Sequence, residues 1–260
     1  MKLYIPTYQR GTALTTLASL HPRLLEKVVI VIRETESSVW ENSPYQILKT
    51  DVLGIAATRQ FILDHTKEEH VCLVDDDLRF AKRFDNESRV YLDQRIENQH
   101  LYSLQAYNQL RAWLLEGIVH CGLTSREGNN RTPLPHMDNT RSMRVLAFNA
   151  PIVKDAGVRF DRVALMEDFD FTLQLLRMHH SNRISTLYMS SPANTSNSPG
   201  GCSEYRAPAV QAEAAHTLKK LHPDFVTVVT KKTKTAWKNA FTGKRVDVRI
   251  AWKKAFGSPP

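Results

Sequence analysis

The most informative stretch of the sequence is Cys72-Leu73-Val74-Asp75-Asp76-Asp77, in which an apolar run leads directly into three carboxylates. The run from Val71 to Val74 has the length and composition of a buried strand. Acids that follow a buried strand lie at the carboxyl edge of the sheet, where open α/β sheets bind ligands. Three adjacent carboxylates repel one another and need a cation or several donors to stay ionised. The stretch therefore predicts a divalent-metal site; the alternative is an Asp-rich turn that caps the next helix.

Short apolar runs alternate with helical patterns on both sides of this stretch, which is typical of an α/β fold. Further strands are expected at Leu3–Ile5, Val28–Ile32, Ile118–Leu123 and Arg144–Asn149. Helices are expected at Thr12–Leu20, Ile55–His65, Ser103–Gly117, Asp168–His179 and Ala207–Leu221. Two polar stretches rich in Gly, Pro, Ser and Asn, Ser125–Ser142 and Ser190–Arg206, are expected to be loops. We therefore expect a mixed, mostly parallel sheet flanked by helices.

The C-terminal part of the chain is strongly basic and has a pattern of its own. Val246, Val248, Ile250 and Trp252 alternate with polar residues, which predicts a half-buried strand. Thr242-Gly243-Lys244 before it is typical of a turn, so the segment is expected to form a hairpin. The predicted organisation is one α/β domain over residues 1–222 and a basic extension over residues 223–260.

Composition limits the class of protein. The 260 residues are 42% apolar and 24% charged, which suits a folded chain of one large domain. Three separated cysteines, no signal sequence and no long apolar run favour a soluble protein of a reducing cytoplasm without a membrane anchor. Lys and Arg exceed Asp and Glu by 35 − 27, a net charge of +8, which favours anionic partners or simply serves solubility.

The order of the motifs resembles that of GT-A glycosyltransferases, especially family-2-like ones. The resemblance rests on Ile5-Pro6-Thr7-Tyr8-Gln9-Arg10, Gly54-Ile55-Ala56-Ala57-Thr58-Arg59 and Val74-Asp75-Asp76-Asp77, and it covers roughly residues 1–190. It implies a Rossmann-like GT-A fold and a nucleotide-sugar donor, with a UDP-sugar expected. It also implies Mn²⁺ or Mg²⁺ on Asp75 and Asp77. The implied nucleotide-sugar contacts are Pro6, Thr7, Arg10, Glu34, Arg59, Asp75 and Asp76. The sequence departs from the family at Arg33-Glu34, where an acid pair is common, and at Gln9 and Gln60, where asparagine is common.

A second acidic motif, Met166-Glu167-Asp168-Phe169-Asp170, resembles the Glu-Asp motif of the same enzymes. In inverting members this motif supplies the base that deprotonates the acceptor hydroxyl. We therefore expect Asp168 to be the base, with Glu167 as the alternative, because a carboxylate at the head of a helix can serve in this role. The competing interpretation is that both acids only offset the helix macrodipole.

Several other residues have two interpretations each. His216 and His222 lie where some GT-A enzymes draw a metal ligand, although His222 precedes a proline and is more typical of a loop. Residues Ser196 to Gly201, with Arg206, either close over a diphosphate through backbone amides or are a connector. Trp237 and Trp252 either stack on bases or anchor a terminal hairpin.

The acceptor is the least constrained part of the prediction. A basic transferase without a membrane segment suits DNA that carries hydroxymethylated pyrimidines, and the chain resembles bacteriophage DNA glycosyltransferases, which act in the host cytoplasm. The residues expected to hold DNA phosphates are Lys231, Lys232, Lys234, Lys238, Lys244 and Arg245. The alternatives are a bacterial transferase acting on glycan, lipid-linked sugar or protein, a metal-dependent phosphoryl-transfer enzyme or nuclease, and a basic nucleic-acid-binding module.

Overall fold

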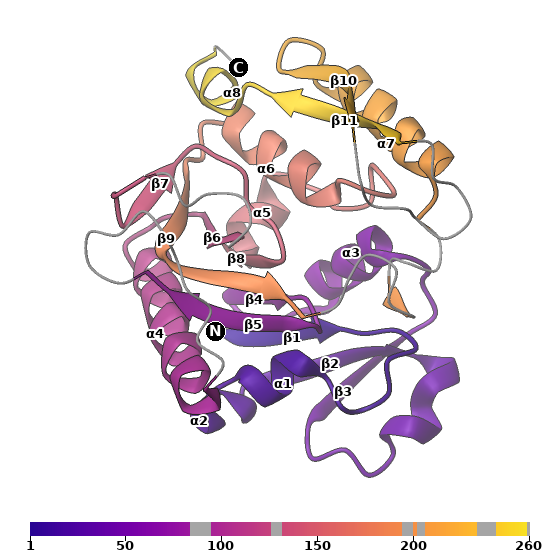
Figure 1. Cartoon of the computed structure of the whole chain (residues 1–260), viewed down its shortest axis with the longest axis vertical. Helices are drawn as coiled ribbons and strands as arrows, with labels where there is room; N and C mark the ends of the chain where they lie inside the picture. Colours follow the sequence, from indigo (N-terminus) through magenta and orange to yellow (C-terminus); the bar gives the residue numbers. More distant parts are fainter. Residues whose placement is uncertain (84–94, 126–131, 194–199, 202–205, 233–242, 259–260) are drawn as a thin grey trace.

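A computed structural model describes the chain except for residues 84–94, 126–131, 194–199, 202–205, 233–242 and 259–260. The described residues form one nine-stranded sheet with helices on its two faces and a separate two-stranded hairpin (Figure 1). In chain order the strands are β1 Lys2–Pro6, β2 Val28–Arg33, β3 Gln46–Thr50, β4 His70–Val74, β5 Leu78–Lys82, β6 His120–Ser125, β7 His136–Asp138, β8 Val145–Asn149, β9 Asn182–Pro192, β10 Val226–Lys232 and β11 Lys244–Ile250. The helices are α1 Thr15–Ser19, α2 Pro22–Leu25, α3 Ile55–His65, α4 Ile96–Leu115, α5 Ala150–Asp155, α6 Glu167–Arg177, α7 Pro208–Leu221 and α8 Trp252–Gly257, with a 3₁₀ helix η1 at Glu34–Trp40.

The sheet is mixed, with strand order β3-β2-β1-β4-β8-β6-β9-β5 and with β7 on the side of β9. The first four strands of this order are parallel to one another. Strand β8 runs antiparallel between β4 and β6, and β9 is again parallel to β6. The carboxyl ends of β1, β2 and β4 therefore lie side by side, and the Asp75–Asp77 segment begins there. The predicted α/β class and the mixed, mostly parallel sheet are confirmed.

Alternation along the central strands divides the core into two layers. On β1 and β4, Leu3, Ile5 and Cys72 pack on one face against residues of α1, α2 and α4. Tyr4 and Leu73 pack on the other face against residues of α3, α5 and α6. Strands that are buried on both faces read as unbroken apolar runs, which is why β2 and β4 could be recognised from sequence.

Helix α3 has the predicted bounds, but the structure differs from the prediction elsewhere. The loop expected at Ser190–Arg206 begins later, because β9 continues to Pro192. The loop expected at Ser125–Ser142 contains β7. A strand, β5, follows Asp77 directly, so the alternative in which the acids cap a helix is wrong.

The C-terminal segment forms the expected hairpin, since β10 and β11 pair antiparallel from Val226↔Ile250 to Lys232↔Lys244. Thr242, part of the expected turn, lies outside the described residues. The apolar face of the hairpin shares a core with α6, α7 and α8, in which Phe169 and Leu173 pack with Val226 and Val248. Figure 1 shows this assembly at one end of the molecule and β1–β3 at the other. None of the described helices has the length and apolar character needed to cross a membrane.

Candidate active site

The backbone of the Asp75–Asp77 segment is held on several sides by hydrogen bonds. Thr16, at the start of α1, donates its hydroxyl to the Asp75 carbonyl at 2.6 Å and accepts from the Leu78 amide at 2.8 Å. The Thr16 amide donates to the Asp76 carbonyl, and the Ala193 amide donates to the Asp77 carbonyl at 2.7 Å. A segment between β4 and β5 that is fixed in this way presents its three carboxylates in a defined direction.

The three carboxylates have different partners. Asp76 is buried, accepts a hydrogen bond from Thr7 at 2.7 Å and pairs with Arg10 at 3.4 Å. Burial raises the pKa of Asp76 to about 6 despite these two partners. Asp77 is half-buried, and burial followed by the charge of Asp75 raises its pKa. The raised pKa values mean that the protonated, neutral forms of Asp76 and Asp77 are favoured more than usual. A bound cation would favour the ionised forms instead.

Arg59 joins the two acidic motifs. From α3, one guanidinium nitrogen donates to Asp75 Oδ1 at 2.9 Å and another donates to Glu167 Oε1 at 2.7 Å. Its side chain is only 4% exposed, so this bridge is screened little by solvent. Met166, just before α6, adopts a left-handed conformation with φ of 66°, which is uncommon for a residue with a side chain. The two acids at the head of α6 are therefore placed by a strained turn and by a buried arginine.

Glu167 and Asp168 have separate roles in this geometry. Glu167 is buried and bound to Arg59, which makes it a structural partner of Asp75. Asp168 accepts from the amide of Phe169 at 3.0 Å. Burial raises the pKa of Asp168, while Arg141 and Arg59 lower it. Burial also raises the pKa of Glu167, to about 7, so basicity does not separate the two acids. Asp168 is better suited to act as the base because Arg59 already binds the Glu167 carboxylate.

Both motifs line one pocket of about 550 Å³, together with the ends of β1, β2 and β3, the start of α3 and the C-terminal hairpin. The predicted site residues that line it are Pro6, Thr7, Arg10, Arg59, Asp75, Asp76, Asp77, Glu167, Asp168, Lys231 and Arg245. The pocket also has basic and aromatic residues that sequence reasoning did not assign to it, namely Arg33, Arg141, Arg144 and Trp252. Arg141 comes from the polar stretch Ser125–Ser142 and Arg144 opens an expected strand, and neither belongs to a motif that pointed to the pocket.

Glu34 does not line the pocket. It lies on η1, where its carboxylate pairs with Lys49 at 3.2 Å and accepts from Ser37. Its neighbour Arg33 lines the pocket instead and stacks on the ring of Tyr8 at 4.4 Å. The reason is that β2 extends to Arg33, one residue beyond the predicted strand, so that the chain turns away into η1 immediately afterwards.

The glycine-rich loop, by which we mean Gly200 and Gly201, packs against Tyr8 and Arg10, just after β1. Gly201 donates its amide to the Tyr8 carbonyl at 2.9 Å, and a Cβ on Gly200 would lie 2.6 Å from that same oxygen. Gly200 also has a positive φ of 82°, so glycine is required here for space and for conformation. Gly201 and Arg206 line the pocket, while residues 196–199 lie outside the described residues.

Only some of the residues predicted to bind DNA phosphates line the pocket. Lys231 and Arg245 line the pocket and both pair with Asp247, whereas Lys232 and Lys244 are exposed outside it. Lys234 and Lys238 lie outside the described residues. The hairpin thus forms a wall of the pocket. Its packing on α6 cannot be read from its sequence.

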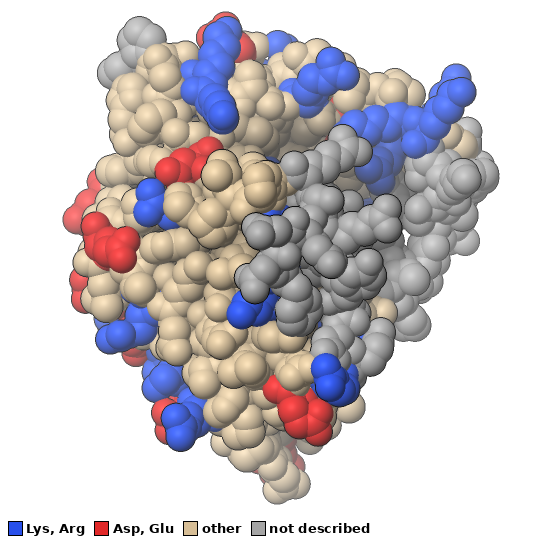
Figure 2. Space-filling model, turned by 60° about the vertical axis from the view of Figure 1, so that its left-hand side comes forward, with Lys and Arg blue, Asp and Glu red and all other residues tan. Residues whose placement is uncertain are grey.

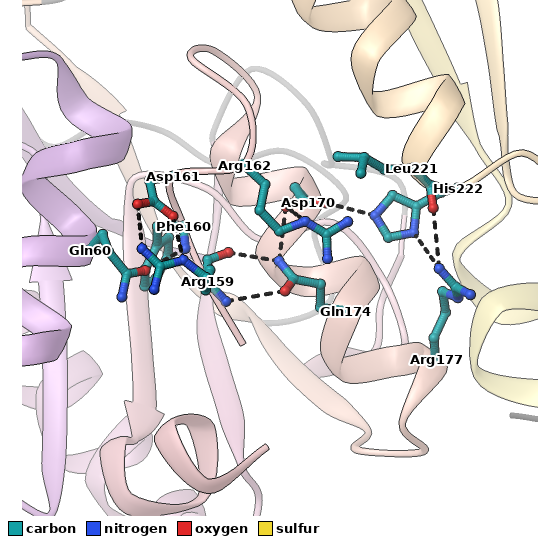
Figure 3. Close-up of polar contacts among 10 residues, drawn as sticks. All are labelled: Gln60, Arg159, Phe160, Asp161, Arg162, Asp170, Gln174, Arg177, Leu221 and His222. Carbon is teal, nitrogen blue, oxygen red and sulfur yellow. Dashed lines mark hydrogen bonds and ion pairs between the residues drawn. The ribbon is translucent and has the colours of Figure 1, made fainter. Parts of the chain in front are cut away.

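His222 lies in the turn that follows α7, as expected for a loop residue, but it is buried and does not line the pocket (Figure 3). Its Nδ1 lies 3.3 Å from a guanidinium nitrogen of Arg177, which can only donate, so Nδ1 accepts and Nε2 carries the proton. Nε2 donates to Asp170 Oδ1 at 2.7 Å. Gln174 and Arg162 contact the other oxygen of Asp170. Both ring nitrogens of His222 are occupied by this network, which ties the end of α7 to α6.

We expect His222→Ala to lower the free energy of unfolding by about 2–4 kcal/mol, because it opens a cavity and removes a donor from the buried Asp170 carboxylate. The matched control is His216→Ala on the exposed side of α7, with an expected change within about 0.5 kcal/mol. Urea denaturation of both variants measures the difference. Equal stabilities of the two variants would show that the network contributes little.

The residues present fit a divalent cation that is shared with a substrate. In the part of the chain that the structure describes, no group of three or more His, Cys, Asp or Glu side chains is arranged to hold a metal alone. Asp77 has no side-chain partner among the described residues, and Asp75 shares its charge with one arginine. One or two carboxylates completed by substrate phosphates are typical of Mg²⁺ sites. The donor set therefore suits a metal that binds together with a diphosphate.

The chain is similar to several solved structures and matches one family model. No curated protein matches the sequence. Similar solved structures include S. aureus TarS residues 1–349 in complex with UDP-GlcNAc (17% identity, TM-score 0.48, 84% of this chain and 67% of that chain) and a mycobacterial protein (9%, 0.52, 96% and 82%). The chain spans 40% of the longer TarS structure. The likeness to the mycobacterial protein concerns the fold alone. The sequence model of the TET-associated glycosyltransferases matches residues 1–201 of the 260, and the chain therefore belongs to the TET-associated glycosyltransferase family.

Proposed function

We propose that this glycosyltransferase moves a sugar from a nucleotide-sugar donor, a UDP-sugar, to an acceptor hydroxyl with inversion at C1 and with Mn²⁺ or Mg²⁺. The observation that carries the proposal is that Asp75–Asp77 and Glu167–Asp168 line a single pocket of about 550 Å³. A nucleotide-sized ligand fits a pocket of this volume. Two acidic motifs that are about 90 residues apart in sequence line this pocket together. The Asp75–Asp77 segment would supply the metal site, and Asp168 would supply the base.

The nucleotide end of the donor is assigned to the sheet edge. Thr7, which follows β1, lines the pocket there with Val31 of β2 and Thr50 of β3. Arg10 lies next to Asp76 and donates toward the Gly200 carbonyl, so it stands between the sheet edge and the glycine-rich loop. Arginine suits phosphate oxygens because its planar group offers two parallel donors. The diphosphate would thus lie between Arg10 and the three aspartates.

Asp77 and Asp75 would hold the cation, which supplies electrostatic neutralisation of the leaving diphosphate when it is bound. The fixed backbone of the segment keeps Asp77 in place for this, since Thr16 and Ala193 hold the carbonyls on both sides. Arg59 limits the negative charge that Asp75 contributes when no substrate is present.

Asp168 would accept the proton of the acceptor hydroxyl as its oxygen attacks C1 of the sugar. The bond between C1 and the phosphate oxygen breaks on the opposite side, so the sugar is transferred with inverted configuration. The electron pair of that bond leaves with the nucleoside diphosphate. Glu167 remains bound to Arg59 and fixes the head of α6 during the reaction.

For the acceptor we propose DNA that contains hydroxymethylated pyrimidines. Figure 2 shows Lys and Arg side chains gathered at the upper end of the molecule, over the C-terminal elements. Lys232, Lys244 and Arg249 are exposed on the same hairpin whose Lys231 and Arg245 line the pocket. Charge of this kind holds a polyanion in place without reading its sequence. A base in a duplex would have to be approached in the major groove or flipped out of the stack.

The acceptor can be tested by mass spectrometry of DNA that contains hydroxymethylcytosine, hydroxymethyluracil or only unmodified bases, incubated with a panel of nucleotide sugars and Mn²⁺. We expect one sugar to be added to one of the two modified bases and none to unmodified DNA. Transfer to a glycan, lipid-linked or protein acceptor but to no DNA would contradict the DNA proposal while the glycosyltransferase assignment stands.

A further inference from the structure

The ladder between β10 and β11 places two cations opposite each other. Lys231 pairs with Arg245 in the register of the hairpin. Like charges directly opposite on an antiparallel pair destabilise it. The only carboxylate that the described hairpin offers them is Asp247, whose Oδ2 lies 3.0 Å from Lys231 Nζ and 3.0 Å from a guanidinium nitrogen of Arg245. Asp247 is buried and also accepts from the Val248 amide, so it is fixed in position.

A third cation, Arg141, faces the same cluster. Its side chain is exposed to the pocket and lies over the ring of Phe169 at 4.4 Å, next in sequence to Asp168. Among the described residues it makes no hydrogen bond or ion pair. Burial in the pocket lowers the pKa of Arg141, the charges of Asp168 and Asp247 raise it in part, and Arg144 and Arg245 lower it further. Arg141 therefore lies within electrostatic reach of the proposed base and of the hairpin.

The cluster has an excess of positive charge. Arg141, Lys231 and Arg245 supply three positive charges and Asp168 and Asp247 two negative ones, which leaves 3 − 2 = +1 even when both acids are ionised. Arg144 also lines the pocket and raises this excess to +2. One phosphodiester carries one negative charge, so its binding would reduce the excess of positive charge.

The place of the cluster separates it from the donor. Trp252 of α8 packs edge-on against Phe169 at 5.7 Å, so the hairpin and α8 are attached beside Asp168. The sheet edge that receives the nucleotide in the proposed function lies beyond Asp75–Asp77, toward the opposite end of the molecule from the hairpin (Figure 1). Lys231 and Arg245 also lie beyond residue 201, where the family match ends.

We propose that Arg141, Lys231 and Arg245 form a subsite for a backbone phosphate of the nucleic-acid acceptor, next to the base that deprotonates the acceptor hydroxyl. This inference rests on the proposed function, in which the acceptor is DNA. The subsite holds the phosphate beside the modified nucleotide and so places its hydroxymethyl group at Asp168. Two arginines and a lysine suit this ligand because guanidinium groups bind phosphate oxygens in pairs. The same chemistry would serve the donor diphosphate, and the experiment separates the two sources.

The test compares two acceptors, a hydroxymethylpyrimidine nucleoside without phosphate and a short oligonucleotide that contains the same nucleoside. The variants are Arg141→Gln and Arg245→Gln, and the control is Arg249→Gln, an exposed arginine of β11 that does not line the pocket. We expect each pocket variant to raise the KM for the oligonucleotide about tenfold or more, because a charge-assisted phosphate contact is lost. The readout is the ratio of the two acceptor KM values: the KM for the free nucleoside and the KM for the donor should change much less than the KM for the oligonucleotide. Turnover of Arg141→Gln should change equally with both acceptors, because Arg141 lowers the pKa of the neighbouring Asp168.

Each outcome has a separate meaning. An equal loss with both acceptors, together with a raised donor KM, would assign the cations to the donor diphosphate and overturn the subsite. Wild-type kinetics in both variants would overturn it as well. If the wild type modifies neither acceptor, the proposed DNA acceptor fails. In that case a salt titration of binding to a labelled oligonucleotide decides the subsite, since each lost contact should lower the slope of log affinity by about 0.7 for a single strand. An unchanged slope in Arg141→Gln and Arg245→Gln would then contradict it.

Discussion

Replacing Asp168 by asparagine is expected to lower turnover by about 10²–10⁴-fold, the range for loss of a general base. Asparagine keeps the shape of the side chain and its contact with the Phe169 amide, but it cannot accept the acceptor proton. The KM for the donor should stay near wild type. The midpoint of thermal unfolding should be unchanged or slightly higher, because burial disfavours the charged form of Asp168 and the neutral amide avoids this cost. Steady-state transfer and nucleotide release measure both parameters.

The dependence of this reaction on pH gives a second signature. A base must be ionised, so the activity of the wild type should fall as pH decreases through the pKa of Asp168, which burial raises above the ordinary value for aspartate. The residual activity of Asp168→Asn should lack this acidic limb. Glu167→Gln serves as the comparison, because it removes the charge that Arg59 binds and should mainly lower stability. If Glu167→Gln loses turnover and Asp168→Asn does not, the assignment of the base is wrong.

Replacing Asp77 by asparagine is expected to abolish metal-stimulated transfer, with a loss on the order of 10³-fold if the cation contributes several kcal/mol to the transition state. The free energy of unfolding at neutral pH should be unchanged or slightly higher. The pKa of Asp77 is raised in the folded chain, so its charge costs stability above that pKa, and the neutral amide avoids the cost. Initial rates at several Mn²⁺ concentrations and a thermal melt measure the two effects.

The control for this variant is Asp155→Asn, an exposed aspartate of α5 that does not line the pocket and should behave as wild type. Excess chelator should inactivate the wild type, and Mn²⁺ or Mg²⁺ should restore it. Full activity of the wild type in chelator would exclude the proposed role of the Asp75–Asp77 segment, while the glycosyltransferase family and fold would stand.

The part of the fold that could be predicted from sequence is the part with strong local patterns. Strands β2 and β4 are buried on both faces and α3 and α6 begin beside recognisable motifs, so periodicity and motif order located them. Strand β3 was missed because its pattern is mostly exposed or half-buried. Strand β5 was missed because it follows the three acids with no turn signal between them.

The acids of the site were predictable for the same reason, and its cations were not. Asp75–Asp77 and Glu167–Asp168 stand at the ends of patterned elements. Arg141 stands in a polar stretch, and its relation to Asp168 exists only after β8 and α6 have packed. The contact between Asp170 and His222 joins residues 52 apart that carry no common motif. Contacts of this kind depend on tertiary packing, which local sequence does not encode.

The central claim is that Asp75–Asp77 and the sheet edge form a metal-assisted site for a nucleoside diphosphate. Calorimetric titration of the wild-type protein with UDP, with and without Mn²⁺, tests it most directly. The account predicts saturable one-to-one binding that is much tighter with Mn²⁺, and it predicts that Asp77→Asn loses this metal-dependent gain. Binding of UDP with the same affinity in the absence of metal, or an unchanged gain in Asp77→Asn, would contradict the claim.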